Sequence, residues 1–212
     1  MSNNIVGFKI YLITDRKLFI DEEFFFGAVE NALKAGIKAV QLREKDLPVR
    51  ELLYMAYRMR EMTVRYGARL FVNERLDVAV SVDADGVHLG SSGIPVSAAR
   101  KAVGGKMMIG VSTHSADEAL DAQKHGADFI TLGPIYPTPS KLKYGKPLGI
   151  RLFESAAGTL SIPVFGIGGI KQDKIAEVIN AGASGIALIS GILGEADAGV
   201  AAKKYIETIG AA

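Results

Sequence analysis

Eight short apolar runs, separated by longer amphipathic segments, constrain the fold of this chain more than any other feature. The runs are 8–13, 38–42, 69–72, 85–89, 107–111, 128–132, 162–167 and 184–189. Most are continuously apolar, which is typical of parallel strands that are covered on both faces. The pattern therefore predicts that strands and helices alternate along the whole chain.

The ends of the helical segments agree with this alternation. We predict helices from Asp21 to Gly36, from Ser115 to Gly126 and from Lys171 to Gly182; several begin at a capping residue and end at a glycine. The eight strand–helix units, in a chain of 212 residues that is 49% hydrophobic, predict an α/β fold: a (β/α)8 TIM barrel in a single domain over residues 1–212. A doubly wound open sheet is the alternative, but no glycine-rich dinucleotide fingerprint follows the first run.

Charge and cysteine content exclude several classes of function. The 25 basic and 23 acidic residues leave a net charge of +2, which gives no reason to expect nucleic acid or an anionic membrane as a partner. The sequence contains no cysteine, so disulfides, thiolate nucleophiles and sulfur-ligated metals are excluded. No run of 18 apolar residues occurs. We therefore expect a soluble, cytoplasmic protein with no membrane partner.

In a barrel of this kind, the residues that follow the strands meet around one mouth, where the chemistry takes place. Gln41, Arg43 and Lys45 occupy alternate positions at the end of the second run, so their side chains should point the same way. Arginine binds phosphate oxygens through two parallel hydrogen bonds and lysine adds a point charge, so the set suits a phosphate or a diphosphate. The alternative is a solvated group of charge pairs with Glu44 and Asp46.

Asn73 and Glu74 follow the third run and offer an amide and a carboxylate to the same mouth. Magnesium usually binds one or two protein carboxylates and completes its shell with water and substrate oxygens, so this pair could hold Mg²⁺. Glu74 could equally be an acidic residue that stabilises the N-terminus of the next helix. No zinc-ligand spacing and no Ser/His/Asp triad can be assembled from the sequence.

A second phosphate site is predicted after the seventh and eighth runs. The glycine-rich segment 166–170 precedes a predicted helix, and the segment 189–191 follows the last run. In many barrels these two loops hold a phosphate on backbone N–H groups. The alternative is ordinary use of glycine in tight turns. The residues alone thus indicate a barrel enzyme with two phosphate sites, one near the second, third and sixth strands and one near the last two.

The connection 133–149 is too long for a routine turn and is rich in proline and lysine, which makes it a candidate lid. Within it, Thr138, Ser140 and Lys141 place two hydroxyls and a cation where a closing loop could clamp an anion. A plain surface loop is the alternative.

The three histidines of the chain differ in their predicted positions. His114 lies beside Ser112 at the end of the fifth run and is either a general acid–base near neutral pH or a structural histidine close to the helix that begins at Ser115. His88 lies inside a predicted strand and His125 at a helix end, so we interpret both as structural.

A series of motifs runs along nearly the whole chain: QLREK (41–45), VNERLDVAV (72–80), GVSTHS (110–115), GPIYPTPSK (133–141), GIGGI (166–170) and ALISGI (187–192). In this order they resemble the thiamine phosphate synthase family, which includes a thiazole tautomerase branch. The resemblance implies an enzyme that joins a hydroxymethylpyrimidine diphosphate to a (carboxy)thiazole phosphate with Mg²⁺. Thiamine phosphate and pyrophosphate are the implied products. The implied reaction is dissociative, because the diphosphate leaves first and the thiazole nitrogen captures a pyrimidine cation.

The resemblance also implies roles for individual residues. The implied binding set for the pyrimidine diphosphate is Gln41, Leu42, Arg43, Glu44, Lys45, Asn73, Ser112 and Lys141. The implied binding set for the thiazole phosphate is Thr138, Pro139, Ser140, Gly169, Ile189 and Ser190. The implied catalytic residues are Arg43, Lys45, Ser112 and Lys141, with His114 in that role in the tautomerase branch.

The sequence departs from the family pattern at the metal site. Glu74 stands where the family usually has aspartate, and it could still bind Mg²⁺. Gly93 stands where the second metal aspartate normally falls, and Ser91 replaces a usual glutamine. The tautomerase branch also lacks that aspartate and needs no metal. The intact set of diphosphate-binding residues nevertheless favours the synthase, because an enzyme acting on a thiazole phosphate alone has little use for those cations.

We therefore predict a thiamine phosphate synthase whose partners are phosphorylated pyrimidine and thiazole substrates. The metal-independent tautomerase and a non-catalytic relative that only binds thiazole phosphate stay open. Another phosphate-binding barrel, such as an indole-glycerol-phosphate or pentose-phosphate enzyme, is the alternative outside this pathway. Against it, the strands contain no obvious catalytic Glu, Asp or Lys. Association into a homo-oligomer also stays open.

Overall fold

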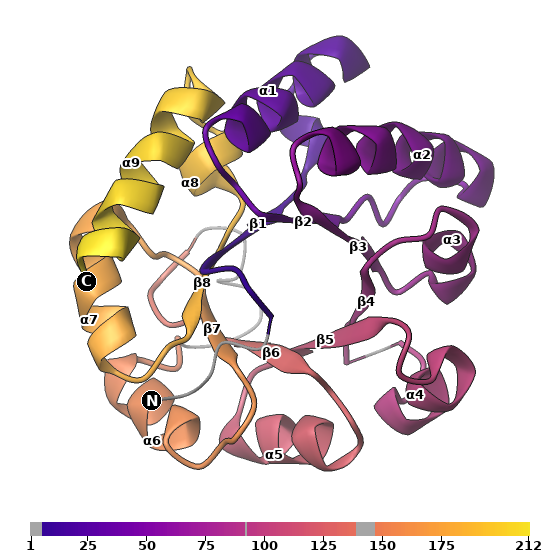
Figure 1. Cartoon of the computed structure of the whole chain (residues 1–212). Helices are drawn as coiled ribbons and strands as arrows, with labels where there is room; N and C mark the ends of the chain where they lie inside the picture. Colours follow the sequence, from indigo (N-terminus) through magenta and orange to yellow (C-terminus); the bar gives the residue numbers. More distant parts are fainter. Residues whose placement is uncertain (1–5, 92, 139–146) are drawn as a thin grey trace.

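The eight predicted strands close into a parallel barrel in a computed structural model of the chain, which describes residues 6–91, 93–138 and 147–212. The strands are β1 (Ile10–Ile13), β2 (Ala39–Leu42), β3 (Arg69–Asn73), β4 (Gly86–Leu89), β5 (Met108–Thr113), β6 (Phe129–Leu132), β7 (Val164–Ile167) and β8 (Gly185–Leu188). Each strand pairs with the next, and β8 returns to pair with β1. Figure 1 shows them as an inner ring in chain order. The predicted α/β TIM barrel is confirmed.

Helices form the outer ring (Figure 1). They are η1 (Arg16–Leu18), α1 (Glu22–Lys34), α2 (Val49–Arg65), α3 (Leu76–Ser81), α4 (Val96–Val103), α5 (Ala116–Lys124), α6 (Ile150–Ala157), η3 (Gln172–Lys174), α7 (Ile175–Asn180), α8 (Ser190–Leu193) and α9 (Ala198–Ala211). The side chains of Asp21 and Ser115 accept backbone hydrogen bonds at the starts of α1 and α5, as their capping positions predict. The helix predicted from Lys171 begins only at Ile175, after the short η3. Among the described residues, no helix is both long and apolar enough to cross a membrane.

Two strands extend further toward the mouth than the apolar runs predict. β3 ends at Asn73, which pairs with His88, and β5 includes Ser112, which pairs with Thr131. Phe8, by contrast, lies inside the first apolar run but precedes β1. The physical reason is that hydrophobicity reports burial rather than strand pairing. Polar side chains at a barrel mouth pair through their backbones, while an apolar residue below the barrel is buried without pairing.

The core has two layers, and the inner layer is aromatic. Leucine, isoleucine, valine and alanine fill the space between the strands and the helices. Inside the barrel, the rings of Phe8, Tyr11, Phe71, Phe129 and Phe165 pack in stacked, edge-to-face or tilted pairs, with centroids 5.0–6.3 Å apart. Glycines on neighbouring strands give these rings room, since a Cβ on any of them would overlap with a ring: Gly86 with Phe71, Gly110 with Phe129, and Gly185 with Phe165. The lower barrel is therefore filled, and open space remains at the mouth.

Candidate active site at the mouth of the barrel

A cavity of about 1100 Å³ opens at the carboxyl ends of β5 to β8. Its lining includes six residues that the sequence analysis selected: Ser112, His114, Thr138, Gly169, Ile189 and Ser190. They come from four strand ends that are distant in sequence, and parallel strands bring such ends to one edge. Four of the residues predicted for the thiazole phosphate, Thr138, Gly169, Ile189 and Ser190, thus line one cavity. Pro139, Ser140 and Lys141 lie outside the described residues.

The turn after β7 depends on two consecutive glycines. Gly168 and Gly169 have φ angles of 93° and 67°, in the left-handed region that favours glycine. A Cβ on Gly169 would also lie 2.7 Å from the carbonyl oxygen of Pro137 and 2.8 Å from Cβ of Tyr136. Within the described parts of the chain, the backbone N–H groups of Gly169 and Ser190 donate no hydrogen bond. Two free N–H donors at a cavity wall suit an anion.

The base of the 133–149 connection is anchored against β7. Backbone N–H groups of Ile135 and Tyr136 donate to carbonyls at the end of β7, at 2.9 and 3.1 Å. The two ends of the connection also bind each other, since Leu148 donates to Pro134 at 2.7 Å and Gly149 donates to Ile135 at 3.1 Å. Residues 139–146 of this predicted lid lie outside the described residues, so its role as a lid stays a prediction.

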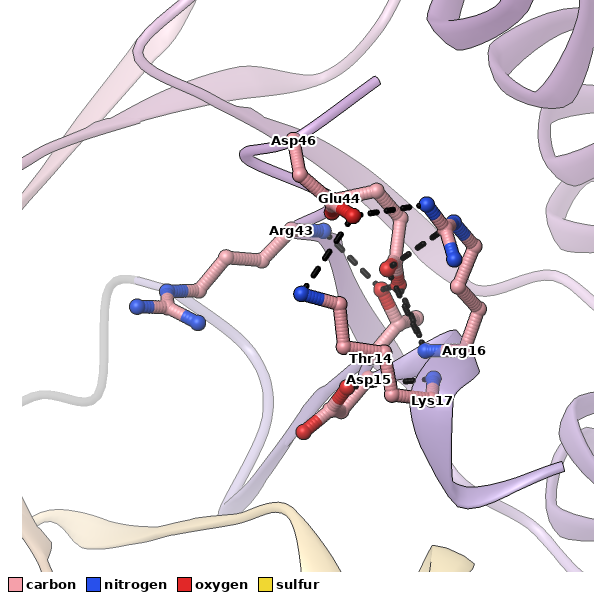
Figure 2. Close-up of polar contacts among 7 residues, drawn as sticks. All are labelled: Thr14, Asp15, Arg16, Lys17, Arg43, Glu44 and Asp46. Atoms are coloured by element: carbon pink, nitrogen blue, oxygen red, sulfur yellow. Dashed lines mark hydrogen bonds and ion pairs between the residues drawn. The ribbon is translucent and has the colours of Figure 1, made fainter. Parts of the chain in front are cut away.

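On the opposite side of the mouth, Glu44 holds the turn after β1 (Figure 2). Its buried carboxylate accepts a hydrogen bond of 2.6 Å from the Thr14 hydroxyl and two of 3.1 and 3.2 Å from the backbone N–H of Arg16. The Thr14 oxygen in turn accepts the backbone N–H of Arg43 at 2.9 Å. Burial raises the pKa of Glu44, and the Thr14 hydrogen bond only partly offsets this. The carboxylate therefore fixes the backbone beneath Arg43.

The guanidinium of Arg43 extends away from this cluster (Figure 2). Within the described parts of the chain it forms no hydrogen bond or ion pair. Asp46 is engaged by other cations instead: Arg16 at 2.8 Å and Lys17 at 3.3 Å. The interpretation of Arg43 as one member of a charge pair with Glu44 or Asp46 is therefore wrong. An arginine whose backbone is held in place and whose guanidinium has no partner among the described residues is suited to bidentate binding of an anion.

Lys45 and Glu74 meet beside the turn that follows β4. Their charged atoms, Nζ and Oε1, lie 3.2 Å apart. Glu74 is a non-glycine residue with a φ angle of 60°, a backbone conformation that costs energy and is concentrated at functional sites. Gly90 leaves room for its carboxylate, because a Cβ there would lie 2.6 Å from Oε1. A Cβ on Gly93 would lie 3.6 Å from Cγ of Glu74, so the position that lacks the expected second carboxylate is adjacent to the first.

A chain of polar side chains crosses the barrel interior and links the two halves of the mouth. Gln41 Nε2 donates to the Tyr11 hydroxyl at 3.1 Å, that hydroxyl lies 3.3 Å from His88 Nδ1, and His88 Nε2 lies 2.9 Å from Ser112 Oγ. Burial lowers the pKa of His88 to about 3, with Arg43 and Lys45 adding to the effect, so the imidazole is neutral. Gln41 and Ser112 are predicted site residues, whereas His88 is predicted to be structural and Tyr11 is not predicted to take part, because alternation alone does not reveal which interior side chains touch.

His114 stands at the cavity edge with one ring nitrogen occupied. Nδ1 lies 2.6 Å from the carbonyl oxygen of Gly133, which can only accept, so this nitrogen carries a proton. The backbone N–H of His114 donates to Glu118 at 2.7 Å. The histidine is therefore fixed by its surroundings, as the structural interpretation predicts, yet it lines the cavity and its Nε2 has no partner among the described residues. Both interpretations of this residue stay compatible with the geometry.

Leu42 and Asn73, the remaining described residues of the predicted site, lie on strands, and the strand pleat sets which way each side chain points. Leu42 is buried in the outer core, so only its backbone can reach a ligand. Asn73 is nearly buried at the end of β3, beside Glu74. Among the described residues, no group of three or more His, Cys, Asp or Glu side chains could hold a metal ion.

Comparison with known proteins identifies the family. The family model described as thiamine monophosphate synthase matches residues 10–192. A relative from Geobacter sulfurreducens is 50% identical over 192 residues, which cover 91% of this chain and 90% of its own. The thiamine-phosphate synthase of Moorella thermoacetica is 43% identical over 181 residues, or 85% of this chain and 86% of its own.

A solved structure agrees with the sequence relatives. The thiamine phosphate pyrophosphorylase of Pyrococcus furiosus superimposes with a TM-score of 0.87 at 36% identity and covers 96% of both chains. Less similar barrels, such as 3-hexulose-6-phosphate synthase at 20% identity, share the fold alone. The agreement of sequence model, relatives and structure shows that the chain belongs to the thiamine monophosphate synthase family.

Proposed function

We propose that this chain is a thiamine-phosphate synthase. It forms a bond between the methylene carbon of a hydroxymethylpyrimidine diphosphate and the nitrogen of a thiazole phosphate. The bond between that carbon and the diphosphate oxygen breaks, and pyrophosphate leaves with the bonding electrons. The observation that carries the proposal is the guanidinium of Arg43, which has no partner among the described residues, because the neighbouring carboxylates of Glu44 and Asp46 are engaged by other groups. The family assignment supports the same activity.

The pyrimidine diphosphate occupies the side of the mouth formed by β2 to β5. Arg43 and Lys45 stabilise the charge that develops on the departing diphosphate, and Lys141, outside the described residues, is predicted to join them. Asn73 and the Ser112 hydroxyl position the same group. Glu44 acts through the β1 turn rather than through the ligand, since both its oxygens are already occupied.

The thiazole phosphate occupies the cavity at β6 to β8. The backbone N–H groups of Gly169 and Ser190, which donate no hydrogen bond within the described residues, bind its phosphate, and Ile189 forms the adjacent wall. Thr138 lines the same cavity, with Pro139 and Ser140 predicted beside it in the part that the structure does not describe. This arrangement holds the thiazole nitrogen beside the pyrimidine carbon, so the acceptor is already in place when the diphosphate leaves.

Magnesium fits this site through Glu74. Gly90 leaves space for that carboxylate, and Mg²⁺ needs only one or two protein carboxylates when a diphosphate supplies further oxygens. The metal would neutralise charge on the leaving group. Lys45 would keep its contact with Glu74 or turn to the diphosphate. Mg²⁺ binding by this chain is part of the proposal.

A thiazole tautomerase is the second candidate, and His114 favours it. His114 lines the cavity and its Nδ1 is fixed on Gly133, which suits proton transfer by Nε2 to and from a thiazole phosphate. The glycine at position 93 fits a metal-independent reaction as well. The synthase would use the cations Arg43, Lys45 and Lys141 to bind the diphosphate. The tautomerase has no diphosphate, so these cations would have no role in its reaction.

The deciding experiment supplies both substrates to the purified protein and measures thiamine phosphate, with Mg²⁺ and with a chelator. We expect product only with the metal. Absence of thiamine phosphate under every condition contradicts the synthase. A parallel assay of thiazole aromatisation, with His114→Asn as the variant, tests the second candidate. A cytoplasmic location and the formation of a homo-oligomer stay predictions. Cell fractionation tests the first, and light scattering tests the second.

A further inference from the structure

His88 is a buried ionisable side chain that the proposed reaction does not use. It lies in the middle of β4 with 1% of its surface exposed, in a barrel interior filled mainly by aromatic and aliphatic side chains. Packing alone would be better served by a leucine or a phenylalanine at such a position, since a buried polar ring needs partners for its nitrogens. Both nitrogens have one, Tyr11 on one side and Ser112 on the other.

The direction of these hydrogen bonds follows from counting protons. Gln41 Nε2 donates to the Tyr11 oxygen at 3.1 Å, so the single hydroxyl hydrogen of Tyr11 is available to His88 Nδ1 at 3.3 Å. Nδ1 then accepts, and a neutral imidazole must carry its one proton on Nε2. That proton is donated to Ser112 Oγ at 2.9 Å. The three contacts together select one of the two neutral tautomers.

The selected tautomer determines what Ser112 can do. Because its oxygen accepts from His88, its own hydrogen is released from the barrel interior. Within the described parts of the chain, Ser112 has no other side-chain partner, and it lines the cavity. A hydroxyl in this state is a donor toward the mouth. With the other tautomer, Ser112 would have to donate inward to Nε2 and would present only lone pairs to an anion.

We propose that His88 is a positioning residue, held by Tyr11 and Gln41, that orients the Ser112 hydroxyl as a hydrogen-bond donor to the diphosphate. The proposal rests on the proposed function, which places the diphosphate at Ser112. It adds two residues, Tyr11 and His88, that touch no substrate. It also connects β2 to β5 through β1 and β4, so that the hydrogen-bond donors on the two sides of the mouth are set by one interior chain.

The first test measures binding of inorganic pyrophosphate with Mg²⁺ by calorimetry, which needs no turnover. Ser112→Ala should weaken binding about 10- to 100-fold, because a hydrogen bond to a charged group is lost. His88→Asn keeps an amide near Tyr11 but does not reach Ser112, and should weaken binding about 3- to 10-fold. His88→Gln, whose amide nitrogen reaches the position of Nε2, should restore binding to within about twofold of the wild type.

The double variant His88→Asn with Ser112→Ala separates positioning from general damage. If His88 acts only through Ser112, the double variant binds pyrophosphate as Ser112→Ala does. Losses that multiply overturn the proposal. Wild-type protein that binds no pyrophosphate and makes no thiamine phosphate contradicts the proposed function together with this inference. Wild-type protein that is active, with multiplying losses, contradicts this inference alone.

The second test reads the tautomer directly and does not depend on the stability of any His88 variant. Nitrogen-15 NMR of the wild-type protein labelled at histidine distinguishes a protonated from a bare ring nitrogen. We expect His88, the histidine whose signals remain once those of His114 and His125 are assigned from His114→Asn and His125→Asn, to carry its proton on Nε2. Tyr11→Phe should produce a mixture of tautomers and weaken pyrophosphate binding. A proton on Nδ1 in the wild type overturns the proposal.

Discussion

Single residues at the mouth differ in whether their charge is already neutralised. Arg16 and Lys17 are engaged by Asp46, and Lys45 by Glu74, whereas the Arg43 guanidinium has no partner in the described structure. A charged side chain without a partner can bind a ligand without first breaking an ion pair. We therefore expect Arg43 to contribute more to diphosphate binding than its paired neighbours.

We predict that Arg43→Ala weakens binding of inorganic pyrophosphate about 10- to 100-fold, because a charge-assisted, two-pronged contact is lost. Arg43→Lys should recover part of the loss, because lysine keeps the positive charge but cannot form the bidentate contact of a guanidinium. Arg65→Ala is the control: Arg65 pairs with Glu30 on the outer ring, away from the mouth. Calorimetry measures all three, and equal effects of Arg43→Ala and Arg65→Ala would refute the assignment.

The missing second carboxylate at position 93 allows a gain-of-function test. A Cβ at this position lies 3.4 Å or more from its neighbours and 3.6 Å from Cγ of Glu74, so an aspartate fits beside the first carboxylate. We predict that Gly93→Asp lowers the Mg²⁺ concentration for half-maximal activity severalfold, because it supplies a second carboxylate ligand. Gly93→Asn has the same size without the charge and should not. Glu74→Gln should raise the metal requirement strongly, and unchanged metal titrations in both variants would contradict the site.

At the scale of the element, a turn is held by a carboxylate that is costly to ionise. Glu44 on the β2 side accepts from Thr14 and Arg16 on the β1 side, and burial is the largest cause of its raised pKa. A raised pKa in the folded state means that the folded protein binds the proton more tightly than the unfolded chain. Glu44 therefore contributes a stability that is complete below the unfolded pKa and is lost as the pH rises through the folded pKa.

We predict that Glu44→Gln, which keeps an oxygen acceptor and cannot ionise, is more stable than the wild type near pH 7. The difference should shrink as the pH falls below about 4, where the wild-type carboxyl is protonated as well. Glu61→Gln, at an exposed position of α2, is the matched control and should show no such dependence. Denaturant unfolding at several pH values measures the effect, and a stability difference that grows toward low pH would show the sign to be wrong.

At the scale of the whole molecule, the barrel depends on pairs of large and small residues on adjacent strands. We predict that Gly110→Ala lowers stability by about 1–3 kcal/mol, because its Cβ would overlap with Phe129 and lie 2.6 Å from His88 Nδ1. For a chain of this size, each kcal/mol shifts the Tm by about 2–4 °C. Gly105→Ala, where nothing lies within 4 Å of the new Cβ, is the control. Calorimetric melting of both variants provides the comparison.

The strand–helix alternation, the barrel and the strand ends that form the mouth could be predicted from the sequence. Each follows from a local property: apolar runs, helix caps and the rule that parallel strands share one carboxyl edge. The same local properties identified Gln41, Arg43, Asn73 and Ser112. They did not show that Arg43 is free and Glu44 occupied, because pairing between residues of a turn and a strand depends on distances across the fold.

The sequence by itself therefore determined the architecture, the family and the residues that surround the mouth. Only the tertiary structure decided which of their charges are available, that Gly93 adjoins Glu74, and that His88 connects Tyr11 with Ser112. The physical reason is range. Hydrophobic periodicity and backbone preference act between neighbours in the chain, whereas hydrogen bonds in the barrel interior join residues 24, 30 and 77 positions apart, and their partners are set by the closure of the barrel.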